Sequence, residues 1–202
     1  MSKTYLLRTC DTNLRSYNNF QWPQSGFVKC PDWSPKQKCG NGLHGLVNGD
    51  GNYDLLDWSS DAKWLVWSTE EEIINLNRKA KAKSGFVEFV GGRKEATDFI
   101  ISKGANPSKV VGAFLFCEAN EKLFGADLST LTGGDGSTLT GGNESTLTGG
   151  YMSTLTGGYG STLTFYYCLN NFKRTKTIYV GEDGILPNVA YKLDKNYGVV
   201  KA

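Results

Sequence analysis

The sequence carries almost no net charge. Its 22 basic residues are offset by 20 acidic ones, which leaves a formal net charge of +2 over 202 residues. A protein that binds nucleic acid mainly through phosphate contacts, or one that mimics nucleic acid, needs a large excess of one sign. We therefore expect neither activity. The basic stretch of residues 78–83 is interpreted as the solvated end of a helix, not as a nucleic-acid site.

The sequence also lacks a long apolar run. No stretch reaches the 18 or so apolar residues of a membrane-spanning helix, and the first residues show no signal-peptide pattern. We expect no membrane insertion and a location in the cytoplasm of the producing or host bacterial cell. The five cysteines are odd in number and irregularly spaced, which fits reduced thiols better than a disulfide framework.

Catalytic and metal-binding motifs are scarce. There is no GxxxxGK[ST] loop, no HExxH and no Cys-x-x-Cys, and His44 is the only histidine. A histidine held in a turn for structural reasons is the first interpretation of His44. Two alternatives stay open: a zinc ligand together with Cys10, Cys30 and Cys39, or a ligand-contacting histidine. The second would resemble ADP-ribosyltransferase-like folds, which use a histidine near a glycine-rich first strand to hold NAD. We expect no enzyme, no metal and no cofactor.

An uninterrupted octapeptide repeat dominates the second half of the chain. Residues 129–164 contain four copies of STLTGGxx, followed by a fifth STLT that begins at Ser161. One octad is too small to bury a core, so the copies must stack. Alternation within STLT places the leucines and serines on one side of a strand and the threonines on the other. The inward residues are expected to be Leu131, Leu139, Leu147, Leu155 and Leu163, with Ser129, Ser137, Ser145, Ser153 and Ser161.

The glycine pair of each octad is expected to form the corner between strands, because glycine readily adopts positive φ. Two octads then close one coil of sixteen residues, and the coils stack at roughly 4.8 Å. Residues 129–164 supply little more than two such coils. The sequence therefore predicts a short β-solenoid with outward Thr-x-Thr rows.

This repeat resembles that of bacterial ice-nucleation proteins, and residues 158–164, GYGSTLT, match their octads closely. The resemblance covers under a fifth of the chain. In that family the Thr-x-Thr rows are thought to order water, and a tyrosine ladder assists the pairing of coils. Here that tyrosine row is broken, because its positions hold Asp135, Asn143, Tyr151 and Tyr159. Each threonine array is only about 10 Å tall, which is too small to nucleate ice efficiently.

Regular elements are also expected on both sides of the repeat. Residues 1–57 are interpreted as irregular. Ser68 and Glu71 form a capping-box pattern that predicts a helix over residues 69–83, between strands at 63–67 and 86–90. A second helix is expected over 93–103, ending at Gly104, and a third strand over 110–116. After the repeat, strands at 165–169, 176–180 and 190–193 would cover the exposed edge of the last coil.

The predicted fold class is α+β, with three parts. A small α/β domain occupies residues 1–125, a two-coil solenoid residues 126–164, and a β-hairpin cap residues 165–202. Residues 39–44 and 176–192 also resemble segments of a poorly characterised group of bacterial and phage proteins, which implies a shared architecture without a known activity.

The predicted function is that of a non-catalytic binding protein whose solenoid is an interaction or oligomerisation surface. A phage-encoded inhibitor of a host protein fits this shape, and the partner is either such a protein or a second copy in a homodimer. The alternatives are weak ice binding through the threonine rows and an enzyme that uses His44. The candidate binding residues are Thr130, Thr132, Thr138, Thr140, Thr146, Thr148, Thr154, Thr156, Tyr151 and Tyr159.

Overall fold

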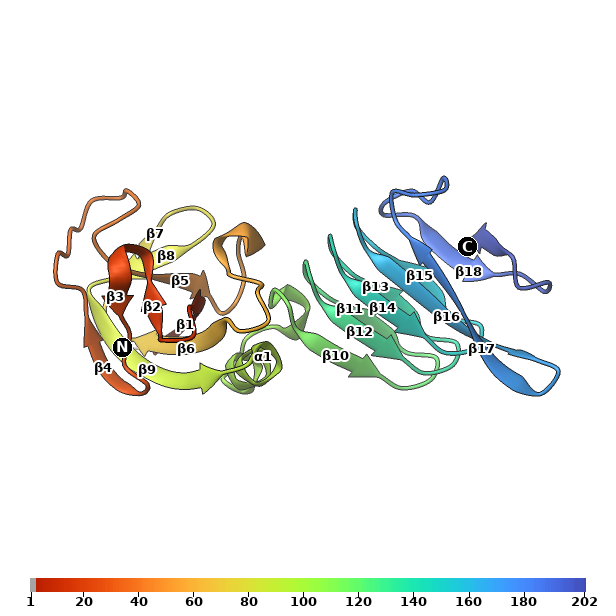
Figure 1. Cartoon of the computed structure of the whole chain (residues 1–202), viewed down its shortest axis with the longest axis horizontal. Helices are drawn as coiled ribbons and strands as arrows, with labels where there is room; N and C mark the ends of the chain where they lie inside the picture. Colours follow the sequence, from red (N-terminus) through yellow and green to blue (C-terminus); the bar gives the residue numbers. More distant parts are fainter. Residues whose placement is uncertain (1–2) are drawn as a thin grey trace. The chain divides into compact units, whose positions relative to one another are not determined.

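The computed structural model describes residues 3–202 and contains two compact units (Figure 1). The N-terminal unit ends at Val110 and the C-terminal unit begins at Val111. The sequence alone predicts this boundary at residue 125. In the structure the strands at 114–117 and 122–124 pair with repeat strands of the C-terminal unit. No helix among residues 3–202 is both long and apolar enough to span a membrane.

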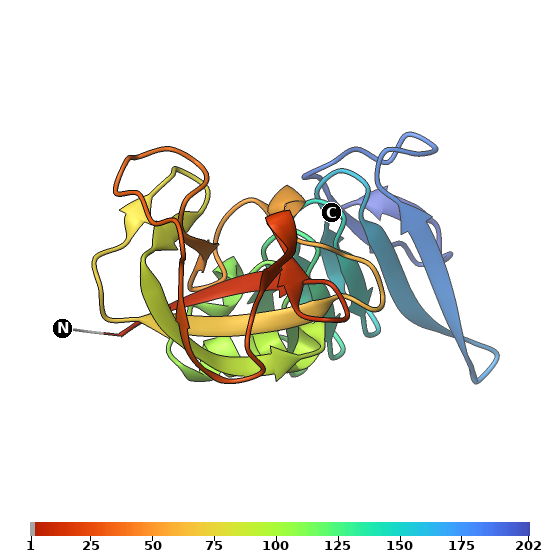
Figure 2. The ribbon, with the colours of Figure 1, turned by 60° about the vertical axis from the view of Figure 1, so that its left-hand side comes forward.

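The N-terminal unit is built on a seven-stranded sheet in which every neighbouring pair is antiparallel (Figure 2). The predicted α/β domain is therefore wrong, and the part of the chain that the structure describes has a single α-helix. The strands, in sheet order, are β4 (Gly26–Lys29), β9 (Ser84–Gly91), β6 (Lys63–Thr69), β1 (Thr4–Cys10), β5 (Leu43–Val47), β8 (Ala80–Ala82) and β7 (Ile74–Asn75). Between β1 and β4 in the sequence, β2 (Arg15–Ser16) and β3 (Phe20–Gln21) form a separate two-stranded antiparallel sheet.

The helix predicted over residues 69–83 is wrong, because Ser68 and Glu71, the expected capping pair, form hydrogen bonds with other residues. The Ser68 hydroxyl lies in β6 and donates to Glu88 Oε1 at 2.6 Å, while Glu71 accepts from the Ser84 hydroxyl. Residues expected on the helix instead form β7 and β8. Lys81, expected on the solvated helix end, is only 1% exposed in β8. Pairing with β5, which is distant in sequence, overrides the local helix pattern.

Other expectations for this unit are confirmed. Strands β6 and β9 lie where predicted, and α1 (Arg93–Ser102) ends before Gly104, whose φ of +98° closes the helix. Ala96, Thr97 and Ile100 of α1 are buried. The core on one side of the sheet contains Trp22 and Trp67 with their rings 5.9 Å apart.

The C-terminal unit is a β-solenoid whose coils repeat every sixteen residues. Thr130 pairs with Thr146 and then with Thr162 in one stack, and Thr138 pairs with Thr154 in the other, always in parallel. The first stack contains β10 (Phe114–Cys117), β12 (Thr130–Gly133), β14 (Thr146–Gly149) and β16 (Thr162–Leu169). The second contains β11 (Lys122–Phe124), β13 (Thr138–Thr140) and β15 (Thr154–Thr156). The solenoid thus has about three coils where two were predicted, because β10 and β11 form a coil from a sequence outside the repeat.

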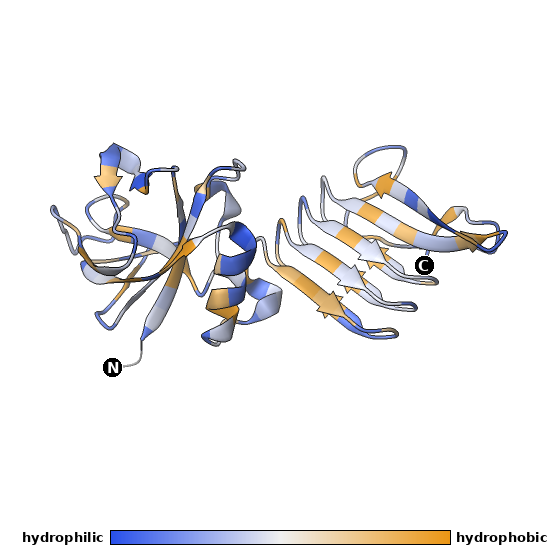
Figure 3. Cartoon of the chain, turned by 60° about the horizontal axis from the view of Figure 1, so that its bottom comes forward, coloured by the Kyte–Doolittle hydropathy of each residue, from blue (hydrophilic) through white to orange (hydrophobic). Residues whose placement is uncertain are grey.

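The inward assignment of leucine and serine is confirmed. All five repeat leucines are fully buried in one cluster, and the five serines are buried with them. Hydrophobic segments accordingly recur at matching places on successive strands (Figure 3). The central column of leucines is what each octad contributes to the core.

The glycine pairs do not form the corners by positive φ. Positive φ recurs instead at the last position of each octad, at Asn120, Leu128, Gly136, Glu144, Met152 and Gly160. The glycine pair is required for space: a Cβ on Gly142 would lie 2.6 Å from the backbone nitrogen of Asp127 in the preceding coil. Close approach of successive coils therefore selects glycine at these positions.

The last strand of each stack is covered by an antiparallel strand. The strand β17 (Phe172–Tyr179) pairs along all of β16, and β18 (Ala190–Leu193) pairs with β15 and with β19 (Val199–Lys201). Asn170 and Asn171, both at positive φ, make the predicted turn between β16 and β17. The C-terminal sheet thus removes the parallel edge that the repeat would otherwise expose.

Candidate functional site

The predicted threonine residues divide between two faces of the solenoid. Thr130, Thr132, Thr146 and Thr148 lie on the stack of β10, β12, β14 and β16, whose outward surface we call the threonine face. Thr138, Thr140, Thr154 and Thr156 lie on the other stack, whose outward surface we call the second face. Tyr151 and Tyr159 lie in turns on different rows, since their backbone amides bond to Asp135 and Asn143 respectively.

The threonine rows of this face carry no charged side chain, and the first cation at an outward position of β17 is Lys173, whose Nζ lies 3.7 Å from the centroid of the Tyr166 ring. Threonines occupy the outward positions of β12, β14 and the start of β16, and the rows continue into Phe116 on β10 and Tyr179 on β17. These two rings are 63% and 52% exposed. The second face differs because Lys122 on β11 and Lys192 on β18 are exposed at its two ends.

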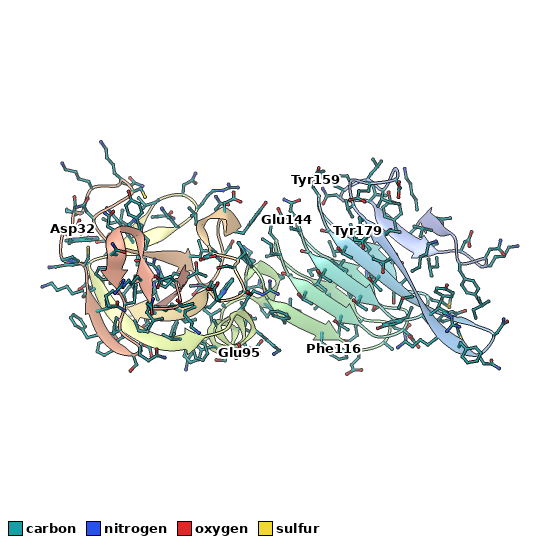
Figure 4. The ribbon with its side chains drawn as sticks, viewed as in Figure 1. Asp32, Glu95, Phe116, Glu144, Tyr159 and Tyr179 are labelled. Atoms are coloured by element: carbon teal, nitrogen blue, oxygen red, sulfur yellow. The ribbon has the colours of Figure 1, made fainter. Side chains whose placement is uncertain are left out.

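Side-chain ladders inside and between the coils hold these faces rigid. Ser137 and Ser153 place their hydroxyls 3.1 Å apart, and Ser161 donates to the Gly142 carbonyl at 3.0 Å. At the turns, Asp135 accepts from the amide of Tyr151 at 2.7 Å. In the broken tyrosine row, the side chains of Asp135 and Asn143 therefore each accept a hydrogen bond from a backbone amide of the next coil. Figure 4 shows Glu144 and Tyr159 together at one edge of the solenoid, where the Glu144 amide donates to the Tyr159 carbonyl at 2.8 Å.

A second candidate site is a cleft of about 910 Å³ in the N-terminal unit. Its lining comes from β1, β5, the segment between these strands, residues 54–56 and Lys79, and it includes Arg8, Tyr17, Cys39 and His44. His44 and Cys39 stand out in the sequence, but the strands β1 and β5 that form the cleft are not predicted by it. The role of Arg8 could not be found from sequence, because its contacts with Trp22 and with the His44 carbonyl join segments distant along the chain.

His44 lies on β5 and is held as a neutral ring. The pKa of His44 is lowered from 6.5 to about 4. Burial is the main cause, and the positive charges of Lys79, Arg8 and Lys81 contribute in the same direction. Its Nε2 atom is buried and has no hydrogen-bond partner among residues 3–202. The other ring nitrogen bonds to the backbone of Gly42. This environment favours the uncharged imidazole at neutral pH.

The thiol of Cys39 lies beside an ammonium group. Lys79 Nζ donates to Cys39 Sγ at 3.0 Å, and this hydrogen bond lowers the pKa of the exposed Cys39 thiol. Lys81 Nζ donates to the carbonyls of Lys38 and Gly40 at 2.8 and 3.0 Å and so fixes the cleft wall. Within residues 3–202 no three His, Cys, Asp or Glu side chains are grouped to hold a metal ion.

We expect acid to destabilise the N-terminal unit through His44. Between pH 6.5 and about 4 the unfolded chain binds a proton at His44 and the folded chain does not, so stability falls as the pH falls through this range. The pKa change corresponds to roughly 3 kcal/mol, which partial solvent exposure reduces to about 2 kcal/mol. Urea unfolding of the wild type and of His44→Gln at pH 7 and pH 4.5 measures this. The substitution should remove most of the difference, and an unchanged pH dependence would contradict the assignment.

The two units define a protein that joins an antiparallel β domain with a cleft to a short, capped β-solenoid. Residues 4–101 match the family described as Domain of unknown function (DUF7666). The chain is also distantly similar to ice nucleation proteins over about half its length, which confirms the resemblance of the repeat.

Three relatives illustrate this similarity. Ice nucleation protein InaU of Pantoea ananas is 33% identical over 107 residues, which is 52% of this chain and 10% of that protein. The ice nucleation protein of Pseudomonas fluorescens is 34% identical over 127 residues, which is 59% of this chain and 10% of that protein. That of Pseudomonas syringae is 33% identical over 111 residues, covering 54% and 10%. The chain thus spans about a tenth of the length of these curated relatives. No solved structure matches the chain.

Proposed function

We propose that the protein is a non-catalytic binding protein that pairs with a second copy of itself through the threonine face. One observation carries this proposal: the threonine rows of β12, β14 and the start of β16 carry no charged side chain, and the same rows end in the exposed rings of Phe116 and Tyr179. Two such faces can approach without charge repulsion. A two-fold axis would bring each aromatic end against the other copy.

The size of the face sets the strength of this pairing. Five strands at about 4.8 Å spacing give a surface roughly 20 Å tall. A surface of that height that is one short strand long covers a few hundred Å². This is below the 800 Å² or so that each partner buries in a stable complex. The self-association should therefore be weak, reversible and dependent on concentration.

A lysine in the centre of the threonine face should abolish this association. Thr148 lies on β14, between Thr132 and Thr164, so Thr148→Lys would place two like charges in the dimer interface. We expect the dissociation constant to rise at least about tenfold, which corresponds to about 1.4 kcal/mol. Sedimentation equilibrium over a concentration series measures it.

The matched control is Thr156→Lys, at the same octad position on the second face. It adds the same charge and should leave the dissociation constant unchanged. A wild-type mass that stays monomeric at all concentrations would refute pairing through this face. Capture of a host protein that depends on Thr148 and not on Thr156 would replace self-association with a heterologous partner.

Similarity to proteins named ice nucleation proteins favours a second candidate, the ordering of water along the threonine rows. The rows have three rungs on the threonine face, which supports adsorption to ice better than its nucleation. Ice-shaping assays on the same two variants separate the candidates. Loss of ice shaping in Thr148→Lys without a change of mass would favour water ordering.

A further inference from the structure

Arg8 is a largely buried cation without an acidic partner. It lies on β1 and lines the cleft, yet no ion pair joins it to a carboxylate within residues 3–202. Its burial lowers the pKa of the guanidinium. Burying a charge away from water without a counter-charge costs free energy. The burial of Arg8 therefore calls for a functional explanation.

The Arg8 guanidinium is also held in place. Its Cζ atom lies 4.4 Å from the centroid of the Trp22 ring. Nη1 donates to the His44 carbonyl at 3.3 Å, and Nε donates to the Thr9 carbonyl at 3.4 Å. The Cys10 thiol also hydrogen-bonds to the guanidinium. Because a guanidinium has five N–H donors, these bonds leave others for a ligand. Stacking on an aromatic ring orients the planar group at little entropic cost.

A second cation stands in the same cleft. Lys79 also lines it, bound to the Cys39 thiol, and the charges that act on His44 are Lys79, Arg8 and Lys81. Two acids line the cleft as well. Asp32 accepts from Asn41 and Cys30, and Asp54 is not within ion-pair distance of either cation. The end of the cleft beside His44 is therefore positive.

We propose that this cleft binds a small organic ligand through an oxyanion, a phosphate or a carboxylate, that pairs with Arg8 and Lys79. The cleft volume of about 910 Å³ lies within the range of small-molecule sites, roughly 300–1,000 Å³. Tyr17 and Phe20 add aromatic surface for the uncharged part of the ligand. The planar guanidinium suits either oxyanion, which it can bind through two parallel hydrogen bonds. This site is independent of the threonine face.

Titration calorimetry with pyrophosphate and with citrate, at constant ionic strength, tests the proposal on the full chain. Pyrophosphate stands for phosphate-bearing ligands and citrate for carboxylate-bearing ones. We expect saturable one-to-one binding of at least one probe, and the stronger probe identifies the class of oxyanion. Arg8→Gln should weaken that binding at least about tenfold, while Arg174→Gln, an equal loss of charge on β17, should not change it.

Lys79→Gln covers the case in which loss of Arg8 disturbs folding, because Lys79 is only half-buried and lies outside the strands. It should weaken binding several-fold while the tryptophan fluorescence of the N-terminal unit stays native. Absence of binding for both probes in the wild type would overturn the proposal. Equal binding by Arg174→Gln, Lys79→Gln and Arg8→Gln would reduce it to non-specific ion association.

Discussion

Replacing Leu147 with alanine is expected to destabilise the C-terminal unit by about 2–5 kcal/mol. Leu147 is fully buried and lies in register between Leu131 and Leu163 on the central strand of the threonine-face stack. Removing its side chain leaves a cavity between coils that cannot collapse, because the backbone hydrogen bonds between coils fix their spacing. Few single substitutions in this unit should have a larger effect.

Native-state hydrogen exchange of the amides of Thr130, Thr146 and Thr162 measures this loss, because these amides donate to backbone carbonyls of the preceding coil. The control is Leu169→Ala at the far end of β16, where the side chain is 43% exposed. That change should cost below about 1 kcal/mol. If Leu147→Ala were equally mild, the inward assignment of the repeat leucines would be wrong.

Replacing Gly142 with alanine is expected to cost about 2–3 kcal/mol through overpacking. The added Cβ would lie 2.6 Å from Asp127 N and 2.9 Å from the carbonyl carbon of Ala126. Both are backbone atoms that cannot turn aside. The same region is where Gly142 N donates to the Gly125 carbonyl at 3.2 Å, so relief of the clash would lengthen a bond between coils.

Gly160→Ala separates the steric cost from the conformational one. Gly160 has φ of +72°, and its added Cβ would meet only the flexible side chain of Glu144, at 3.3 Å. We expect a smaller loss of about 1 kcal/mol from left-handed backbone strain. Urea unfolding followed by circular dichroism compares the two variants. A loss for Gly142→Ala no larger than that for Gly160→Ala would contradict the assignment of the glycine pair to close approach of the coils.

The elements that sequence analysis predicted correctly are those whose cause is local. Helix α1 carries its own stop signal at Gly104, and the turn at Asn170 and Asn171 carries residues that tolerate positive φ. The helix predicted over 69–83 failed because Ser68 and Glu71 bond across strands to Glu88 and Ser84, which local pattern cannot anticipate. Strands β1 and β5 were missed because neither alternates clearly between apolar and polar residues.

The candidate sites divide in the same way. The sequence by itself determined the sixteen-residue coil, the buried leucines and the outward threonines, because the strand of each octad pairs with copies sixteen residues away and the repeat makes those neighbours nearly identical. Only the tertiary structure decided that the threonine rows of one face end in Phe116 and Tyr179, since both rings come from outside the repeat. The cleft also depended on tertiary structure: Arg8, His44 and Lys79 meet through antiparallel pairing of strands distant in sequence, and no local pattern encodes that pairing.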